Sequence, residues 1–209
     1  YTLEFDGQDD AAELLGEILW DAAACKMSCR KSIKFFQCQH EVVVHETPCM
    51  LVLTLPGNAR WHRVSALVQL YLKAELLEDL KHDDPLCGVC GQTGETSMAF
   101  HGVQPDVCVL RINRYSAGME RSADEVYPDP VLVLGGDLYQ LQAVIAHQGN
   151  SSQRGHYIMY VRSAQGWERR EDHMCRLVGQ ESVPPCTLSE VYVVCLLYTS
   201  PSPQDLSTS

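Results

Sequence analysis

Residues 139–172 read YQLQAVIAHQGNSSQRGHYIMYVRSAQGWERRED, and this stretch decides the fold. Two apolar runs, QLQAVIAHQ and HYIMYVR, flank the polar segment GNSSQRG, a pattern that predicts two antiparallel strands joined by a turn. GWERRED is expected to form a third strand. His156 opens the second run, and the acidic pair Glu171-Asp172 follows shortly after it. A histidine with a carboxylate placed to orient its ring is two thirds of a nucleophilic hydrolase site.

The flanking sequence adds helices before this stretch and strands on both sides of it. Leucines at helical spacing predict helices over residues 9–24 and 64–80. Apolar runs predict further strands at 41–45, 50–55, 107–113, 131–134 and 191–197. Because a helical part comes first and a strand-rich part follows, the predicted fold class is α+β.

Composition excludes several classes of partner. The 209 residues carry 16 basic and 27 acidic side chains, which gives a net charge of −11. That balance argues against binding to nucleic acid or to an anionic membrane surface. No apolar run approaches the roughly 20 residues that span a bilayer, and the first residues lack the order of a signal peptide. We therefore expect a cytoplasmic or nuclear protein. Since the chain starts at Tyr1 rather than at a methionine, we also expect it to be a piece of something longer.

Cysteine placement indicates a metal site rather than a disulfide framework. The ten cysteines are Cys25, Cys29, Cys38, Cys49, Cys87, Cys90, Cys108, Cys175, Cys186 and Cys195. Only Cys87 and Cys90 form a tight C-x-x-C pair, and glycines flank it. In a reducing compartment such a pair is typical of a metal-binding knuckle.

Four stretches in a fixed order resemble the signature motifs of one family. They are QDDAAEL at 8–14, the helix and knuckle VSALVQLYLKAELLED…CGVC at 64–90, PDVCVLRINRY at 105–115 and the histidine box at 139–172. Each motif alone is a weak signal, but the order and the full histidine box make a strong one. From residue 8 to about residue 197 the chain resembles the ubiquitin-specific cysteine proteases, which are deubiquitinating enzymes.

The resemblance implies a papain-like architecture of thumb, fingers and palm, with most of the thumb missing. It places a thumb remnant at 1–35, zinc-bearing fingers at 36–104 and a palm with the histidine box at 105–197. The implied partners are ubiquitin and ubiquitinated proteins. The implied reaction is thiol-dependent hydrolysis of the isopeptide bond after the C-terminal glycine of ubiquitin.

The resemblance also assigns roles within the histidine box. His156 matches the catalytic histidine, which takes the thiol proton and later protonates the leaving lysine amine. Glu171 matches the carboxylate that orients the histidine, at a position where the family usually has Asp or Asn. Asp172 matches the second acid of the family, which is expected to assist or replace Glu171.

The nucleophile is expected to lie outside this sequence. The family's cysteine box precedes the helix that begins with the QDDAAEL motif, and only seven residues stand before that motif here. The asparagine that helps to build the family's oxyanion hole belongs to the same missing piece. Cys25 and Cys29 lie in a basic neighbourhood that lowers a thiol pKa, but their sequence context does not match. We therefore expect this chain alone to be inactive, or to be a non-catalytic ubiquitin-binding or scaffolding relative.

The family holds structural zinc with two C-x-x-C knuckles. Cys87 and Cys90 supply one of them. The other begins at Cys38, but Glu41 stands where its second cysteine belongs, so His40 is the predicted replacement ligand. His45 and Cys49 are further candidates. The competing hypothesis is that this knuckle has decayed and that no zinc binds.

The remaining polar residues have simple expected roles. We expect His147 to be a structural residue at a strand end, and Arg154, Arg169 and Arg170 to form a solvated rim. Solvated positions are also predicted for His62, His82 and His101. The tail at 198–209 is rich in proline and serine and is predicted to be disordered. The stretch CLLYTSPSP at 195–203, which overlaps this tail, resembles a translated sequencing adapter, which would end the native sequence near Val194.

Overall fold

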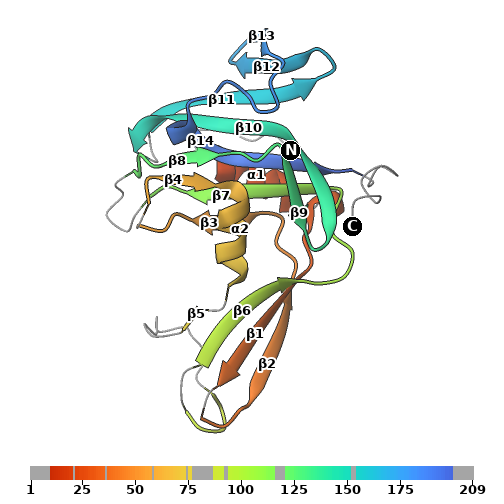
Figure 1. Ribbon diagram of the computed structural model, residues 1–209, viewed down its shortest axis with the longest axis vertical. Helices are drawn as coiled ribbons and strands as arrows, with labels where there is room; N and C mark the ends of the chain where they lie inside the picture. The colour runs from red at the N-terminus through yellow and green to blue at the C-terminus, as the bar shows by residue number, and fades with distance from the viewer. Residues whose placement is uncertain are drawn as a thin grey trace.

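In the computed structural model the described residues are 10–20, 22–35, 37–57, 59–73, 75–76, 87–91, 94–115, 121–151 and 154–199. They form a large sheet that carries two helices and a small sheet that extends away from it (Figure 1). This combination confirms the predicted α+β class. No helix among the described residues is long and apolar enough to cross a membrane.

The large sheet has eight strands. Its order is β13 (Met174–Gly179), β12 (Gly166–Glu171), β11 (Arg154–Ser163), β10 (Asp137–Ser151), β14 (Val191–Tyr198), β7 (Val107–Asn113) and β3 (Leu51–Thr54), and β9 (Val131–Leu134) also pairs with β10. The β3–β7 pair is parallel and the other pairs are antiparallel. The antiparallel hairpin predicted from residues 139–163 is therefore confirmed.

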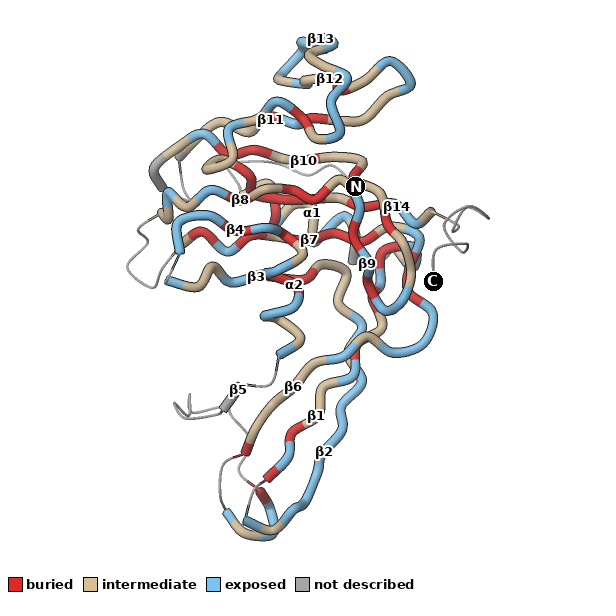
Figure 2. Tube along the Cα trace, viewed as in Figure 1, coloured by how far each residue is buried: buried red, intermediate tan, exposed pale blue. Residues whose placement is uncertain are grey.

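The small sheet has four strands in the order β2 (Glu41–Glu46), β1 (Cys29–Phe35), β6 (Gly94–Phe100) and β5 (Glu75–Leu76). All of its pairs are antiparallel. A separate pair, β4 (Trp61–Arg63) and β8 (Glu125–Tyr127), completes the strands. Figure 2 shows that burial is concentrated in the large sheet, whereas the outer strand of the small sheet is exposed.

The helices α1 (Ala11–Trp20) and α2 (Val64–Leu72) cover opposite faces of β7. Leu110 packs in the main core with Leu67 of α2, whereas its neighbour Val109 packs in a second cluster with Ala12 of α1. Adjacent residues of a strand point to opposite faces, so each helix buries one face. Asp10 caps α1, because its Oδ1 accepts a hydrogen bond of 2.7 Å from the Ala12 N–H.

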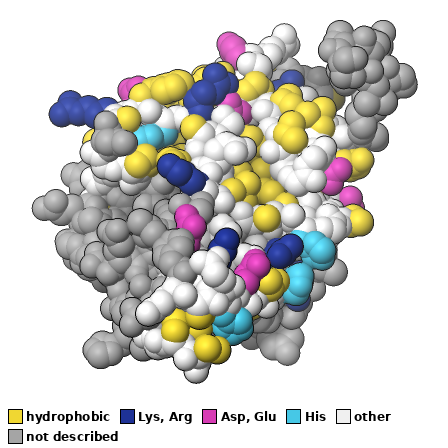
Figure 3. Space-filling view, turned by 60° about the horizontal axis from the view of Figure 1, so that its bottom comes forward, with side chains coloured by type: hydrophobic (Ala, Val, Ile, Leu, Met, Phe, Trp, Pro, Cys, Tyr) yellow, Lys and Arg dark blue, Asp and Glu magenta, His cyan; other side chains and the backbone are white. Residues whose placement is uncertain are grey.

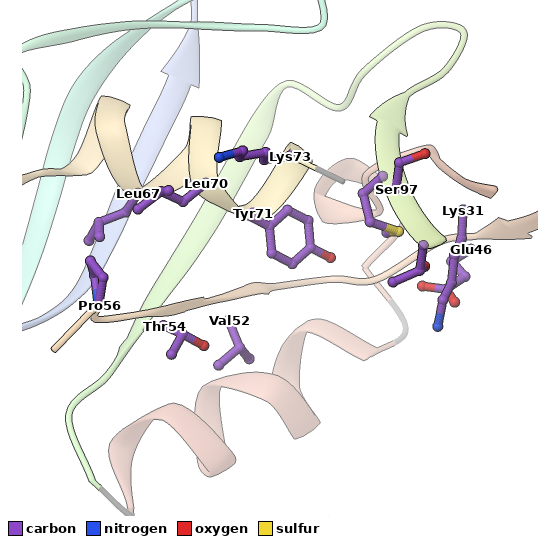
Figure 4. A pocket seen from close by; sticks show the side chains of 12 residues that line it. Lys31, Glu46, Val52, Thr54, Pro56, Leu67, Leu70, Tyr71, Lys73 and Ser97 are labelled. Carbon is purple, nitrogen blue, oxygen red and sulfur yellow. The ribbon is translucent and has the colours of Figure 1, made fainter. Parts of the chain in front are cut away.

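A hollow separates α2 and β3 from the small sheet (Figure 4). Leu67, Leu70 and Tyr71 reach it from α2, and Val52 and Thr54 reach it from β3. Its lining residues do not include any from the hairpin of β10 and β11. The hollow therefore lies away from the predicted histidine site.

Three sequence predictions need correction here. The helix predicted at 64–80 ends at Leu72, because Lys73 turns to extended angles (φ −66°, ψ 143°) and the chain enters β5; residues 77–86 lie outside the described residues. His62 was predicted to be solvated, yet it is 6% exposed and lies 3.2 Å from Asp124. The segment predicted to be disordered begins at Tyr198, which is the last residue of β14; residues 200–209 are outside the described part.

Candidate functional site

The hairpin of β10 and β11 places His156. Its register pairs Gln148 with His156 and His147 with Tyr157, and an irregularity follows Gln148. His156 thus lies at the start of β11, near the turn, and its side chain is 41% exposed. The sheet fixes the backbone of the histidine while leaving one side of the ring open to solvent.

Glu171 reaches His156 from the next strand. The β11–β12 register pairs Met159 with Arg170, so the end of β12 comes beside the start of β11. The His156 Nε2 and Glu171 Oε1 atoms are 2.6 Å apart. Among the described residues, Nδ1 of His156 has no hydrogen-bond partner.

Arg169 holds the other oxygen of the same carboxylate. Its Nη1 forms an ion pair with Oε2 of Glu171, and both side chains are less than one fifth exposed. Burial alone would raise the pKa of Glu171, but the hydrogen bonds from His156 and Arg169 hold that pKa below its usual value. Arg169 also bonds to Tyr160, its cross-strand partner. The carboxylate therefore stays ionised and is held from two sides.

Asp172 does not join this arrangement. It is exposed, and it occupies the turn after β12 with φ of 48°, in the left-handed region. Among the described residues it forms no ion pair with His156. Of the two predicted acids, only Glu171 contacts the ring.

A buried aromatic cluster supports the hairpin beneath His156. The His147 side chain is 1% exposed, and its Nδ1 lies 3.0 Å from the Tyr115 hydroxyl. Its ring is 4.5 Å from that of Tyr157, between centroids. A Cβ atom at Gly155 would lie 2.0 Å from the His147 ring, so only glycine fits beside it. His147 is thus structural, as predicted, although it lies inside β10 rather than at the end of the strand.

Arg114 closes the other side of the cluster, and sequence reasoning gave it no role. Its guanidinium is 1% exposed and donates to the carbonyl oxygens of Val191, Asp124 and Leu188 at 2.6, 2.8 and 3.0 Å. Burial lowers its pKa to about 10. Arg114 therefore ties β7 to β14 and to the segment before β8.

The predicted metal ligands gather at the far end of the small sheet. The ligand atoms of Cys38, Cys87 and Cys90 all lie within 4.8 Å of one another. The Sγ atoms of Cys38 and Cys87 are 3.4 Å apart, and Nδ1 of His40 is 3.6 Å from the Cys87 sulfur. Burial opposes ionisation, but hydrogen bonds, led by that from the Cys90 backbone and including that from His40, lower the pKa of Cys87 to about 6.

These distances suit a metal. Tetrahedral zinc with Zn–S bonds of about 2.3 Å separates its sulfur ligands by about 3.8 Å. Gln39, between Cys38 and His40, has φ of 56°, and this left-handed turn brings two ligands of the narrow C-x-H spacing to one side. The three-cysteine cluster can bind a metal ion. His45 and Cys49 are not part of it.

Cys25, Cys29 and Cys108 are poor candidates for a nucleophile. Burial raises the pKa of Cys25, and it raises that of Cys29 to about 11 and that of Cys108 to about 12. A thiol with a raised pKa is protonated and inert at neutral pH. The two cysteines considered from sequence therefore do not supply an activated thiolate.

A family model for ubiquitin carboxyl-terminal hydrolases matches residues 3–198. The chain belongs to the ubiquitin carboxyl-terminal hydrolase family. The resemblance to ubiquitin-specific proteases that the sequence motifs indicated is thereby confirmed. Among the relatives of this chain, ubiquitin carboxyl-terminal hydrolase 17-like protein D of Mus musculus is 34% identical over 47% of the chain. Ubiquitin C-terminal hydrolase 15 of Oryza sativa subsp. japonica is 28% identical over 74% of it.

Solved structures share the fold of this chain. A SAGA DUB module of Ubp8, Sgf11, Sus1 and Sgf73 bound to monoubiquitin matches with a TM-score of 0.69 and 20% identity. It covers 85% of this chain and 41% of that one. The same module bound to ubiquitin aldehyde matches with a TM-score of 0.67 and 20% identity. The chain thus spans less than half of the solved chain, and about a fifth of the curated relatives (20% and 17%).

Sequence reasoning missed the neighbour that holds the orienting acid. Arg169 was expected on a solvated rim, but it is paired with Glu171. The signal was present, because residues two apart on a strand share a face. The adjacent Arg170 is 50% exposed and pairs with Glu168 on the opposite face, as a rim residue should.

Proposed function

We propose that this chain is the histidine-bearing part of a thiol-dependent deubiquitinase. The proposed reaction hydrolyses the isopeptide bond after the C-terminal glycine of ubiquitin. The observation that supports it best is the 2.6 Å contact between Nε2 of His156 and Glu171. This contact fixes the ring so that Nδ1 faces outward with its lone pair free.

In this proposal His156 moves the proton. Nδ1 takes the proton from a cysteine thiol, and the resulting thiolate attacks the carbonyl carbon of the isopeptide bond. The imidazolium then gives that proton to the departing lysine nitrogen as the C–N bond breaks, leaving ubiquitin as a thioester on the sulfur. Water, deprotonated by the same ring, cleaves the thioester and restores the thiol. The negative charge of Glu171 stabilises the imidazolium in both halves.

Arg169 compensates for the unusual acid. Glutamate has one more rotatable bond than the aspartate that the family usually carries, so a free Glu171 would visit more rotamers. The ion pair with Arg169 holds Oε2 and thereby leaves Oε1 directed at His156. We assign Arg169 as a positioning residue, with Asp172 outside the proton path.

The nucleophile is proposed to come from sequence beyond this chain. Burial gives Cys25, Cys29 and Cys108 raised pKa values, which support this view. Cys87 has a lowered pKa but belongs to the thiol cluster of the small sheet, opposite the end that carries β11 and β12 (Figure 1). This chain by itself is therefore expected to be inactive.

The two sheets correspond to the parts of the family's papain-like hand. We propose that the small sheet is the fingers and the large sheet is the palm, with α1 as a remnant of the thumb. Cys38, Cys87, Cys90 and His40 would hold a structural zinc, which would tie the two ends of the fingers together. Ubiquitin is the proposed partner, and the net charge of −11 suits the basic face of ubiquitin.

A second candidate is a non-catalytic ubiquitin-binding or scaffolding relative. The observation that favours it is Glu171 in place of the usual Asp or Asn, together with a first knuckle in which Glu41 replaces a cysteine. Both departures are expected where catalysis no longer constrains the sequence.

A ubiquitin probe with an electrophilic C-terminus separates these candidates. On protein extended upstream to include a cysteine box, the probe should label one cysteine. His156→Ala should abolish labelling, whereas the matched control His101→Ala, at an exposed histidine of the small-sheet side, should leave it unchanged. An extended protein that never reacts supports the scaffold. Labelling that survives His156→Ala would disprove the role given to His156, and labelling of this chain alone would disprove the external nucleophile.

A further inference from the structure

The outer strand of the small sheet presents an apolar edge. The three consecutive valines of β2, Val42, Val43 and Val44, are 36%, 41% and 42% exposed. Figures 1 and 2 show β2 as the outermost strand of this sheet and exposed along its length. Within the described part of the chain, β2 pairs with β1 alone. An exposed apolar edge of this kind is a template on which another strand can pair.

The register identifies which backbone groups of β2 point outward. The Phe35 N–H donates to the His40 carbonyl, so this pair is a hydrogen-bonded one. Hydrogen-bonded pairs alternate along an antiparallel ladder. Val42 and Val44 therefore bond to β1, and Glu41, Val43 and His45 direct their N–H and C=O groups away from the sheet. The His101 N–H bond to the Ser28 carbonyl, on the β6 side of β1, fits the same alternation.

We propose that β2 is the interface at which two copies of this chain pair edge to edge. The strands would run antiparallel about a two-fold axis at Val43. In that register Val43 faces Val43 of the second copy, and Glu41 faces His45 of the second copy. All three outward residues then exchange backbone bonds, about six in total. Val42 and Val44 of one copy face Val44 and Val42 of the other, so the apolar side chains cover one another.

The side-chain charges of β2 favour this register and favour a second copy of the chain as the partner. A register centred on Glu41 would set two glutamates against each other, and one centred on His45 would set two histidines against each other. Only the axis at Val43 places Glu41 opposite a histidine. Locally, three basic residues stand against four acidic ones, so the strands of the small sheet are close to neutral: Arg30, Lys31 and Lys34 of β1, and Glu41 and Glu46 of β2, Glu95 of β6 and Glu75 of β5. The end that carries the small sheet shows acidic, basic and histidine side chains together (Figure 3). The charge of −11 is therefore not concentrated where the copies would meet.

The proposed pairing of β2 strands gives a closed dimer. Because both copies use the same edge, the contact is isologous and stops at two chains. The combined sheet would have the order β5-β6-β1-β2 followed by the same strands of the second copy in reverse. This interface uses no residue of the His156 site, so it stands or falls independently of the proposed chemistry.

Sedimentation velocity over a range of concentrations tests the proposal on this chain, with amide exchange read at high and low concentration. We expect a monomer–dimer equilibrium without larger species. In the dimer the amides of Glu41, Val43 and His45 should become protected, while those of Val42 and Val44, already bonded to β1, should change little. A monomer at every concentration, or protection that does not follow this alternation, would overturn the proposal.

Substitutions at the axis provide the second arm. Val43→Lys places two ammonium groups opposite each other and should weaken dimerisation by about tenfold or more. Val43→Pro removes an outward N–H that the monomer does not use, so the fold should persist while dimerisation weakens. Val52→Lys, at an exposed valine of the β3 edge, is the matched control and should leave the dimer intact. A dimer that is unaffected by Val43→Lys, with circular dichroism showing a folded variant, would also refute the proposed interface.

Discussion

The His156 site and the thiol cluster bring their side chains together in different ways. His156 and Glu171 stand on neighbouring strands in the large sheet, so hydrogen-bonded ladders set their separation. Cys38, Cys87 and Cys90 lie in turns beyond the ends of strands, where no ladder holds them. Strand pairing brings the residues of the first site together, whereas the second site, where we propose a structural zinc, is assembled from turns. The two sites should therefore respond differently to the same kinds of change.

The largest difference should appear when a thiol ligand is removed. Cys87→Ser should lower the zinc content from about one ion per chain to near zero. Amide exchange should then show loss of protection at the far end of the small sheet, with β10 and β11 unchanged. Cys175→Ser, at an exposed cysteine of β13, is the control and should change neither quantity. Zinc-free protein with a fully protected small sheet would contradict the proposed structural role of zinc.

Removing the buried Arg114 cation should destabilise the large sheet and leave the thiol cluster unchanged. Arg114→Met leaves carbonyl oxygens of Val191, Asp124 and Leu188 without a donor inside the large sheet. We expect a loss of about 3 kcal/mol in the free energy of unfolding, measured with urea. Zinc content should stay the same. A loss of zinc in this variant would show that the two regions are coupled.

A smaller effect is expected at the glycine before the histidine. Gly155→Ala brings a methyl group against the His147 ring and the Gln148 carbonyl, which must shift to accept it. We expect a cost of about 1–3 kcal/mol in unfolding free energy, with changed NMR signals at His156. Gly57→Ala has nothing within 4 Å and should have little effect. If both variants were equally stable, the close packing beside His156 would be disproved.

These particular residues also show where sequence analysis succeeds and where it stops. Strands at 107–113 and 131–134 were predicted correctly, because local alternation reflects which face is buried. The small sheet was mostly missed, since β1 pairs with β6, which is distant in the sequence, and β1 reads as a basic stretch. His62 was misjudged because its partner, Asp124, comes from a distant strand end.

The site residues show the same contrast: those within local motifs were predicted, and roles that depend on distant contacts were not. His156 and Glu171 were found through a motif that lies within one hairpin and the next strand, and the structure brings them into contact. Cys38, Cys87 and Cys90 were found through short spacings, and they also meet. Asp172 was named because it matches the family's second acid, yet its left-handed backbone conformation leaves it exposed. Arg114 was quoted within a motif without its role, because nothing local marks a buried guanidinium.

The smallest expected effect separates two adjacent arginines. Arg169→Gln removes the ion that holds Oε2 of Glu171, so the His156 ring signals should shift and broaden in NMR spectra. Arg170→Gln breaks an exposed pair with Glu168 on the opposite face and should leave those signals unchanged. Arg169→Lys, which keeps the charge, should restore most of the wild-type spectrum. Equal responses to Arg169→Gln and Arg170→Gln would argue against the positioning role of Arg169.

The most direct test of the account is the protonation of the His156 ring in this chain. Nitrogen-15 NMR above the pH at which histidine titrates, with the signals assigned by comparison with His156→Gln, reports which ring nitrogen carries the hydrogen. The account predicts a proton on Nε2, donated to Glu171, and a bare Nδ1 ready to take the proton of a thiol. A neutral ring with its hydrogen on Nδ1 would contradict it, because that nitrogen could not then act as the base.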